Sequence, residues 1–118
     1  MQGGKEVLIT SGIDMIYEVA MQTISGSHIQ INVDTLRRFS TGDICAVFDH
    51  ETVHVNQFRT QEGRNLLYGK QPGLAEAEAY KHNVDNFSRY GQTSVYTKKW
   101  FNERYHYCLA NSAGCNNH

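Results

Sequence analysis

Apolar side chains recur at helical spacing near the start of the chain and alternate with polar ones directly afterwards. The first pattern covers residues 13–24, with apolar side chains at Ile13, Ile16, Tyr17, Ala20, Met21 and Ile24. Positions three and four apart share one helix face, so this spacing predicts an N-terminal helix that ends at Ser25-Gly26. Residues 27–33 instead place Ile29, Ile31 and Val33 on one face, which predicts a half-buried strand.

Three longer helices are predicted in the rest of the chain. The first covers residues 43–61, after the start signal Ser40-Thr41-Gly42-Asp43. A loop over residues 63–73 closes at Pro72-Gly73, and helices over 74–90 and 93–108 follow. We therefore expect a single α+β domain, mostly helical, over residues 1–118, with flexible ends at 1–10 and 111–118.

The numbers of basic and acidic residues, and the absence of long apolar runs from the sequence, argue against several classes of function. The chain carries 11 Lys and Arg against 12 Asp and Glu, a net charge of −1, which argues against a generic nucleic-acid binder because no basic field neutralises phosphates. No apolar run approaches the roughly 18 residues of a membrane span. The start Met1-Gln2-Gly3-Gly4-Lys5 has no signal-peptide pattern. If the protein leaves its cell, we expect a dedicated machine or a longer polypeptide to carry it.

The three cysteines are too few for a disulfide framework. Cys45 lies in an apolar run and is expected to be a core thiol. Cys108 and Cys115 bracket the segment Leu-Ala-Asn-Ser-Ala-Gly. They could form a bridge, which would imply an oxidising destination, or remain two free thiols.

Residues 50–54 read His50-Glu51-Thr52-Val53-His54 on the predicted helix 43–61. Histidines four residues apart project from the same helix face, with Cβ atoms roughly 5–6 Å apart, and both can bind one zinc ion. A glutamate after the first histidine lies near the same site, where it can accept a proton from a zinc-activated water. Glu51 also falls inside the apolar stripe of this helix, where a carboxylate without a partner or a task is costly.

A catalytic zinc needs a third protein ligand and one open position. The downstream candidates all lie on the predicted helix 74–90, and they are Glu76, Glu78, His82 and Asp85. At about 100° per residue, Glu76 falls on the apolar face of that helix and Glu78 on the polar face. We therefore expect Glu76 to be the third ligand, with Glu78 as the alternative.

The segment from His50 to Arg59, followed by Glu76-Ala77-Glu78-Ala79-Tyr80, resembles small zinc metallopeptidase domains of the gluzincin type. It is most similar to the domains found as toxin ends of Rhs-type and other polymorphic or type VI secretion effectors of bacteria. The resemblance covers about residues 43–90. It implies that His50, His54 and Glu76 bind Zn²⁺ and that Glu51 is the catalytic base. Tyr80 stands where such domains often have an aspartate that steadies a ligand histidine.

The same resemblance implies a zincin-like fold. Its expected parts are an N-terminal helix, a small sheet whose edge strand (residues 27–33) lies along the cleft, and the two zinc-bearing helices. An extended peptide could add to that edge strand by main-chain hydrogen bonds. Aromatic residues of the predicted helix 93–108 fall into two groups. Tyr96, Trp100 and Tyr107 are expected to pack in the core, and Tyr105 or His106 to stabilise the transition state, with Tyr68 and Tyr107 as further candidates.

The expected reaction is hydrolysis of a peptide bond. Zinc would polarise the scissile carbonyl and lower the pKa of its water to about 7, and Glu51 would take a proton from that water and pass it to the leaving amine. The resemblance implies a peptide or protein substrate, a cognate immunity protein, production in the cytoplasm and secretion by a dedicated machine. The target-cell periplasm is then the expected place of action.

Three alternatives remain open from the sequence. The same zinc site could cleave amide bonds of peptidoglycan. The chain could instead be a non-enzymatic interaction domain with a structural zinc, for which His82 or Cys45 would have to be the fourth ligand. It could also be a regulatory protease that cleaves a repressor in its own cytoplasm.

Overall fold

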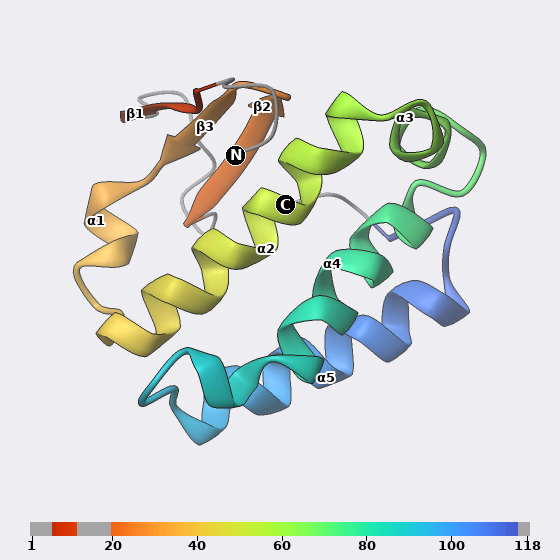
Figure 1. Cartoon of the computed structure of the whole chain (residues 1–118). Coiled ribbons are helices and arrows are strands. Elements are labelled where there is room, and N and C mark those ends of the chain that lie inside the picture. Colours follow the sequence, from red (N-terminus) through yellow and green to blue (C-terminus); the bar gives the residue numbers. More distant parts are fainter. Residues whose placement is uncertain (1–5, 12–19, 116–118) are drawn as a thin grey trace.

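The computed structural model describes residues 6–11 and 20–115, and it has an α+β architecture that is mostly helical (Figure 1). In chain order the elements are β1 (Leu8–Ser11), β2 (Met21–Ser25), β3 (His28–Ile31), α1 (Val33–Leu36), α2 (Thr41–Arg59), α3 (Gln61–Leu67), α4 (Gly73–Asp85), the 3-10 helix η2 (Phe87–Arg89) and α5 (Val95–Ala110). The predicted fold class is confirmed at this level, whereas the zincin-like resemblance stays an expectation. None of the helices in the described part of the chain combines the length and apolar character needed to cross a membrane.

Helix α2 lies between the small sheet on one side and α4 with α5 on the other (Figure 1). Met21 and Ile29 of the sheet pack against Val55 of α2 in one apolar cluster. A second cluster joins α2 to α4 and α5, and its buried members are Ala46, Ala77, Tyr80, Phe101, Cys108 and Cys115. Two opposite faces of α2 are therefore covered, which explains why polar residues in the middle of this helix are buried.

The sheet has the order β1-β3-β2, so the prediction of an edge strand at residues 27–33 is wrong. Strand β3 is central because Leu8–Ser11 pairs with it in parallel on one side and β2 pairs antiparallel on the other. Residues 8–10, expected in a flexible tail, thus belong to a strand. The edge strand that contacts α2 is β2.

The predicted helix over residues 13–24 is also contradicted at its end, where Met21–Ser25 forms β2; residues 12–19 of that prediction lie outside the described residues. Burial in β2 alternates: Met21 and Thr23 are buried, while Gln22 and Ile24 are exposed. Pairing with β3 satisfies the backbone and places only one of the two apolar side chains inside. The helical spacing of Met21 and Ile24 was therefore coincidental.

The long helices are found close to their predicted positions. The Ser40 hydroxyl caps α2 by accepting from the Asp43 N–H at 3.1 Å, as the start signal indicated. Helix α2 ends at Arg59, and Thr60 caps a further helix, α3, which starts at Gln61 and runs to Leu67, into the segment 63–73 predicted to be a loop. Helix α4 ends at Asp85, short of the predicted residue 90, and α5 both starts and ends two residues later than the predicted helix 93–108.

The segment after α5 fixes the start of α4. Cys108 and Cys115 form a disulfide and both are buried, so of the two outcomes left open by the sequence the structure has the bridge. The Gly73 N–H donates to Ser112 O at 2.7 Å, and a Cβ at Gly73 would lie only 2.6 Å from that oxygen. Glycine is thus required for this close approach. Cys45, expected in the core, is exposed on α2.

Candidate metal centre

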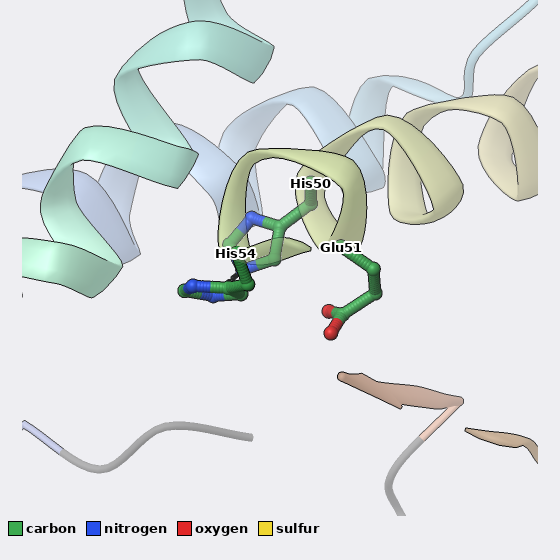
Figure 2. Close-up of side chains that lie close together, drawn as sticks. All are labelled: His50, Glu51 and His54. Carbon is green, nitrogen blue, oxygen red and sulfur yellow. Dashed lines mark hydrogen bonds between the residues drawn. The ribbon is translucent and has the colours of Figure 1, made fainter. Parts of the chain in front are cut away.

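Helix α2 places His50, Glu51 and His54 close together (Figure 2). The ligand atoms of these three side chains all lie within 4.8 Å of one another, and all three residues are buried. The two imidazole nitrogens that face each other, Nε2 of His50 and of His54, are 3.3 Å apart. This group could hold a metal ion.

Helix α4 brings a second carboxylate to the two histidines. Glu76 Oε1 lies 2.6 Å from His50 Nε2, and Glu76 Oε2 lies 3.2 Å from His54 Nε2. Glu76 is fully buried, so its predicted inward face is confirmed, whereas Glu78 is exposed. Each oxygen of Glu76 therefore faces one histidine.

The orientation of His50 is set by Asn83, which lies on the same face of α4 as Glu76. Asn83 Nδ2 donates to Ala46 O at 2.8 Å and to the Tyr90 hydroxyl at 3.2 Å. Its Oδ1 is thereby left as an acceptor, 2.9 Å from His50 Nδ1. This network assigns the Nδ1 proton to His50 and directs its Nε2 atom toward Glu76.

Gln57 sets the orientation of His54 in the same way as Asn83 sets that of His50. Gln57 Nε2 donates to Ala75 O and to Glu78 Oε1, each at 2.9 Å, so Gln57 Oε1 accepts from His54 Nδ1 at 2.7 Å. The Nε2 atom of His54 is then left to face Glu76. Both histidines are thus held in the orientation that metal-binding histidines adopt when their other nitrogen is hydrogen-bonded.

The Nε2 atoms of His50 and His54 and the carboxylate of Glu76 converge on one point. All of them are hydrogen-bond acceptors unless a proton or a metal cation lies between them. With both Nδ1 atoms donating, the Nε2 lone pairs point at a carboxylate and at each other across 2.6–3.3 Å. Glu76 Oε2 is buried, and His54 Nε2, 3.2 Å away, can donate a hydrogen bond to it only when that nitrogen carries a proton. Only protons or a metal ion can relieve this arrangement, and two nitrogens with one oxygen are a donor set that suits zinc.

The shifted pKa values of His54 and Glu76 also indicate that a positive charge is stabilised at this site. Burial alone would lower the pKa of His54, but its hydrogen bond with Glu76 and the charge of that carboxylate outweigh burial and raise the pKa to about 9. Burial alone would raise the pKa of Glu76, yet the charges and hydrogen bonds of His50 and His54 lower it to about 2. In the absence of metal, a proton on the histidines therefore occupies the place of a cation.

The side chain of Glu51 points toward the sheet (Figure 2). Its Oε1 accepts from the Thr23 N–H at 2.8 Å and lies 2.8 Å from Thr23 Oγ1. Thr23 belongs to the edge strand β2, so a backbone donor of that edge is occupied by Glu51. The predicted burial of Glu51 is confirmed.

A cleft of about 920 Å³ opens at the side of the cluster where His50 and Glu51 lie. Its walls come from β2, the first half of α2, α4 and α5. The aromatic and charged side chains that line it are Arg38, Phe39, Asp43, Tyr80, Tyr96, Trp100, Phe101 and Arg104. Tyr96 and Trp100, predicted to be core residues, are 77% and 40% exposed and form part of this wall, while Tyr107 is exposed outside it.

The structure does not bring every candidate residue to this cleft. Tyr105 and His106, expected to stabilise the transition state, are not among its described lining residues, and His106 is exposed. They follow Arg104 on α5, and Tyr105 packs against the second apolar cluster. His82 pairs with Asp49 Oδ2 at 2.8 Å, and with Cys45 exposed both fourth ligands considered for a structural zinc are engaged elsewhere or face outward.

Two residues that sequence reasoning gave no role, Gln57 and Asn83, hold the histidines. The role expected at Tyr80 is taken by Asn83, while the Tyr80 ring packs on His50 with centroids 4.4 Å apart. The available signal was spacing, because Asn83 lies seven residues after Glu76 and so shares its helix face. Comparison of the chain with protein-family models, with curated proteins and with solved structures finds no match.

Proposed function

We propose that this protein is a zinc-dependent metallopeptidase, with His50, His54 and Glu76 as the zinc ligands and Glu51 as the general base. One observation carries the proposal: two histidines with fixed Nδ1 protons direct both Nε2 atoms at one buried carboxylate. Such a set of two nitrogens and one oxygen, next to an open cleft, is typical of a catalytic rather than a structural zinc.

Glu51 rather than Glu76 is the base because their surroundings differ. Glu76 lies within 3.2 Å of both histidine Nε2 atoms, whereas Glu51 is bound by Thr23 of the sheet. Glu51 also lines the cleft, where water and substrate can reach it. The carboxylate between the histidines thus serves as a ligand and the one facing the cleft is available for proton transfer.

The reaction needs three things from the site. When bound, zinc supplies a Lewis acid that polarises the scissile carbonyl and makes water acidic enough to ionise near neutral pH. Glu51 takes the proton of the attacking water as the new C–O bond forms, and it delivers that proton to the leaving amine as the C–N bond then breaks. Thr23 holds the Glu51 carboxylate at the β2 edge.

We assign to Tyr80 the stabilisation of charge on the carbonyl oxygen. It lines the cleft with His50 and Glu51, and burial followed by the charge of Glu76 raises the pKa of its hydroxyl, which stays a donor. A preorganised donor of this kind acts where negative charge develops in the transition state. Tyr80 thereby replaces Tyr105 and His106 in the proposed mechanism.

The biological setting is proposed from the sequence resemblance alone. It supports an antibacterial effector domain that acts on a peptide or protein in the target-cell periplasm and is neutralised by a cognate immunity protein in the producer. The disulfide between Cys108 and Cys115 suits an oxidising compartment such as the periplasm.

The decisive experiment combines metal content with hydrolysis. Purified protein should contain about one zinc per chain and cleave denatured casein, and Glu51→Gln should keep the zinc while losing cleavage by a factor of at least about 100. Glu62→Gln, on α3 away from the cleft, is the matched control. A Glu51→Gln variant that cleaves at the parent rate refutes the mechanism, and parallel incubation with purified sacculi separates protein from peptidoglycan as the substrate.

A further inference from the structure

Arg104 is a cation of the cleft wall that faces the proposed zinc site across Tyr80. Its guanidinium carbon lies 6.0 Å from the centroid of the Tyr80 ring, and that ring packs on His50. The guanidinium also lies 4.9 Å above the ring of Tyr107. Arg104 is half-buried and is therefore held at one place in the cleft by the aromatic rings around it.

The charge of Arg104 has no counterpart among the described residues. Its polar contacts are the Tyr80 hydroxyl and, at 3.6 Å, the weak acceptor Cys115 Sγ. The ion pairs of the described chain involve other residues, including the Lys99–Glu103 pair on the same helix. A guanidinium that reaches the cleft without a carboxylate partner among the described residues can bind an anion that enters the cleft.

The acids of the cleft are not available to neutralise Arg104. Asp43 is buried at the start of α2, where its Oδ1 accepts from the Ser94 N–H at 3.0 Å. Glu51 is bound by Thr23. The remaining wall near Arg104 is apolar and aromatic, formed by Trp100, Phe101 and Tyr96.

We propose that Arg104 binds a carboxylate of the substrate, and that the substrates are peptides carrying a free carboxylate and an apolar side chain next to the scissile bond. The guanidinium fork matches a carboxylate bidentately, and the aromatic wall accepts the side chain. This inference rests on the proposed function for the bond that is cleaved, but the carboxylate site itself can be measured without turnover. The carboxylate could be a chain terminus or the side chain of Asp or Glu.

Equilibrium binding tests the site directly, because Trp100 is the single tryptophan of the chain and lines the cleft. Its fluorescence, excited at a wavelength that phenylalanine does not absorb, should report N-acetylphenylalanine binding at least about tenfold more tightly than N-acetylphenylalaninamide. Arg104→Met should remove this preference for the acid. Lys99→Met, an exposed position on the same helix, makes the same change in net charge and should retain the preference.

Two further variants separate the shape of the guanidinium from its charge and test the second arginine of the cleft. Arg104→Lys keeps the charge but loses the fork, and should give an intermediate preference with unchanged circular dichroism, so a folding defect of Arg104→Met does not decide the outcome. Arg38 also lines the cleft but is exposed. If Arg104→Met folds and retains the full preference, if Arg104→Lys retains the full preference while Arg38→Met abolishes it, or if acid and amide bind equally, the proposal is overturned.

Cleavage products identify the source of the carboxylate. Mass spectrometry of denatured casein digested by the parent protein should show cuts next to a free C-terminus if Arg104 binds a chain end, or next to internal Asp and Glu if it binds a side chain. Either preference supports the proposal when Arg104→Met loses it, and an unselective pattern overturns it. A chain that prefers the acid in binding but cleaves nothing would refute the proposed function and leave the carboxylate site intact.

Discussion

Thr23 binds the carboxylate of Glu51 through its backbone as well as its side chain. The Thr23 N–H donates to Glu51 Oε1 at 2.8 Å, and Thr23 Oγ1 lies 2.8 Å from the same oxygen and 3.0 Å from the Glu51 carbonyl. All three contacts are buried. The edge of the sheet and the proposed catalytic base are thus joined directly, and β2 positions the base.

Removing the Thr23 hydroxyl should impair catalysis more than metal binding. Thr23→Val keeps the N–H contact and the shape of the side chain but deletes a buried hydrogen bond, which typically lowers the free energy of unfolding by about 1–2 kcal/mol. We expect an unchanged zinc content, a reduced kcat and a nearly unchanged KM. Thr23→Ser retains the hydroxyl and should behave like the parent; equal losses in both variants would contradict this role for the hydroxyl.

Loss of Asn83 should weaken zinc binding although Asn83 is not a ligand. Asn83→Ala removes the acceptor of the His50 Nδ1 proton, and loss of such a partner typically lowers metal affinity about 10- to 100-fold. Titration with a competing chelator measures this change. Asn102→Ala, at an exposed position of α5, is the control and should leave the affinity unchanged.

Substitution of the two glutamates of α4, Glu76 and Glu78, should have clearly different effects on the zinc content of the protein. Glu76→Ala removes the carboxylate shared by the histidines, so the purified variant should contain almost no zinc. Glu78→Ala removes only the exposed partner of Gln57 Nε2 and should remain loaded with at most a modest loss of affinity. A loaded Glu76→Ala variant would show that Glu51 or another group completes the ligand set.

The helical half of the fold was predictable because its signals are local. Ser40 caps α2 as its residue type predicts, and the inward faces of Glu51 and Glu76 follow from helical periodicity. The strand predicted at residues 27–33 is found as β3, but the order of the sheet was not predictable, because it depends on contacts between distant segments. Leu8–Ser11 carries no strong strand pattern, yet its parallel pairing turns β3 into the central strand and leaves β2 as the edge.

The residues that hydrogen-bond the two histidines could not be predicted from the sequence for a related reason. Whether Asn83 or Tyr80 hydrogen-bonds the Nδ1 atom of His50 depends on the angle at which α4 crosses α2, and residue spacing does not contain that angle. Tyr105 and His106 fail as cleft residues for the same reason, because the face of α5 that meets the cleft is set by Trp100, Phe101 and Arg104. A sequence pattern finds the face of one helix, whereas the site is built from four elements.

Deleting the Tyr80 hydroxyl should lower the rate without changing the metal site. Tyr80→Phe keeps the ring that packs on His50, Phe101 and Trp100, so folding and zinc content should match the parent. Loss of one donor to the transition state typically lowers kcat about 100- to 1,000-fold. Steady-state kinetics should show the loss in kcat with little change in KM, whereas a raised KM at constant kcat would contradict the role proposed for the hydroxyl.

The stability of the chelator-treated protein should depend on pH in a sense opposite to that of the zinc-loaded protein. The pKa of His54 is raised from 6.5 to about 9, so its contribution is complete below pH 6.5 and is lost as the pH rises through 9. The pKa of Glu76 is lowered from 4.5 to about 2, so its contribution is present above pH 4.5 and is lost as the pH falls toward 2. In EDTA, the thermal midpoint should therefore be highest between about pH 4.5 and 6.5 and should decline toward pH 9.

Zinc competes with protons for the same histidines, so in excess zinc the thermal midpoint should instead rise from about pH 5.5 to 7.5. Parallel pH profiles with and without zinc would show that the histidines do not bind the metal.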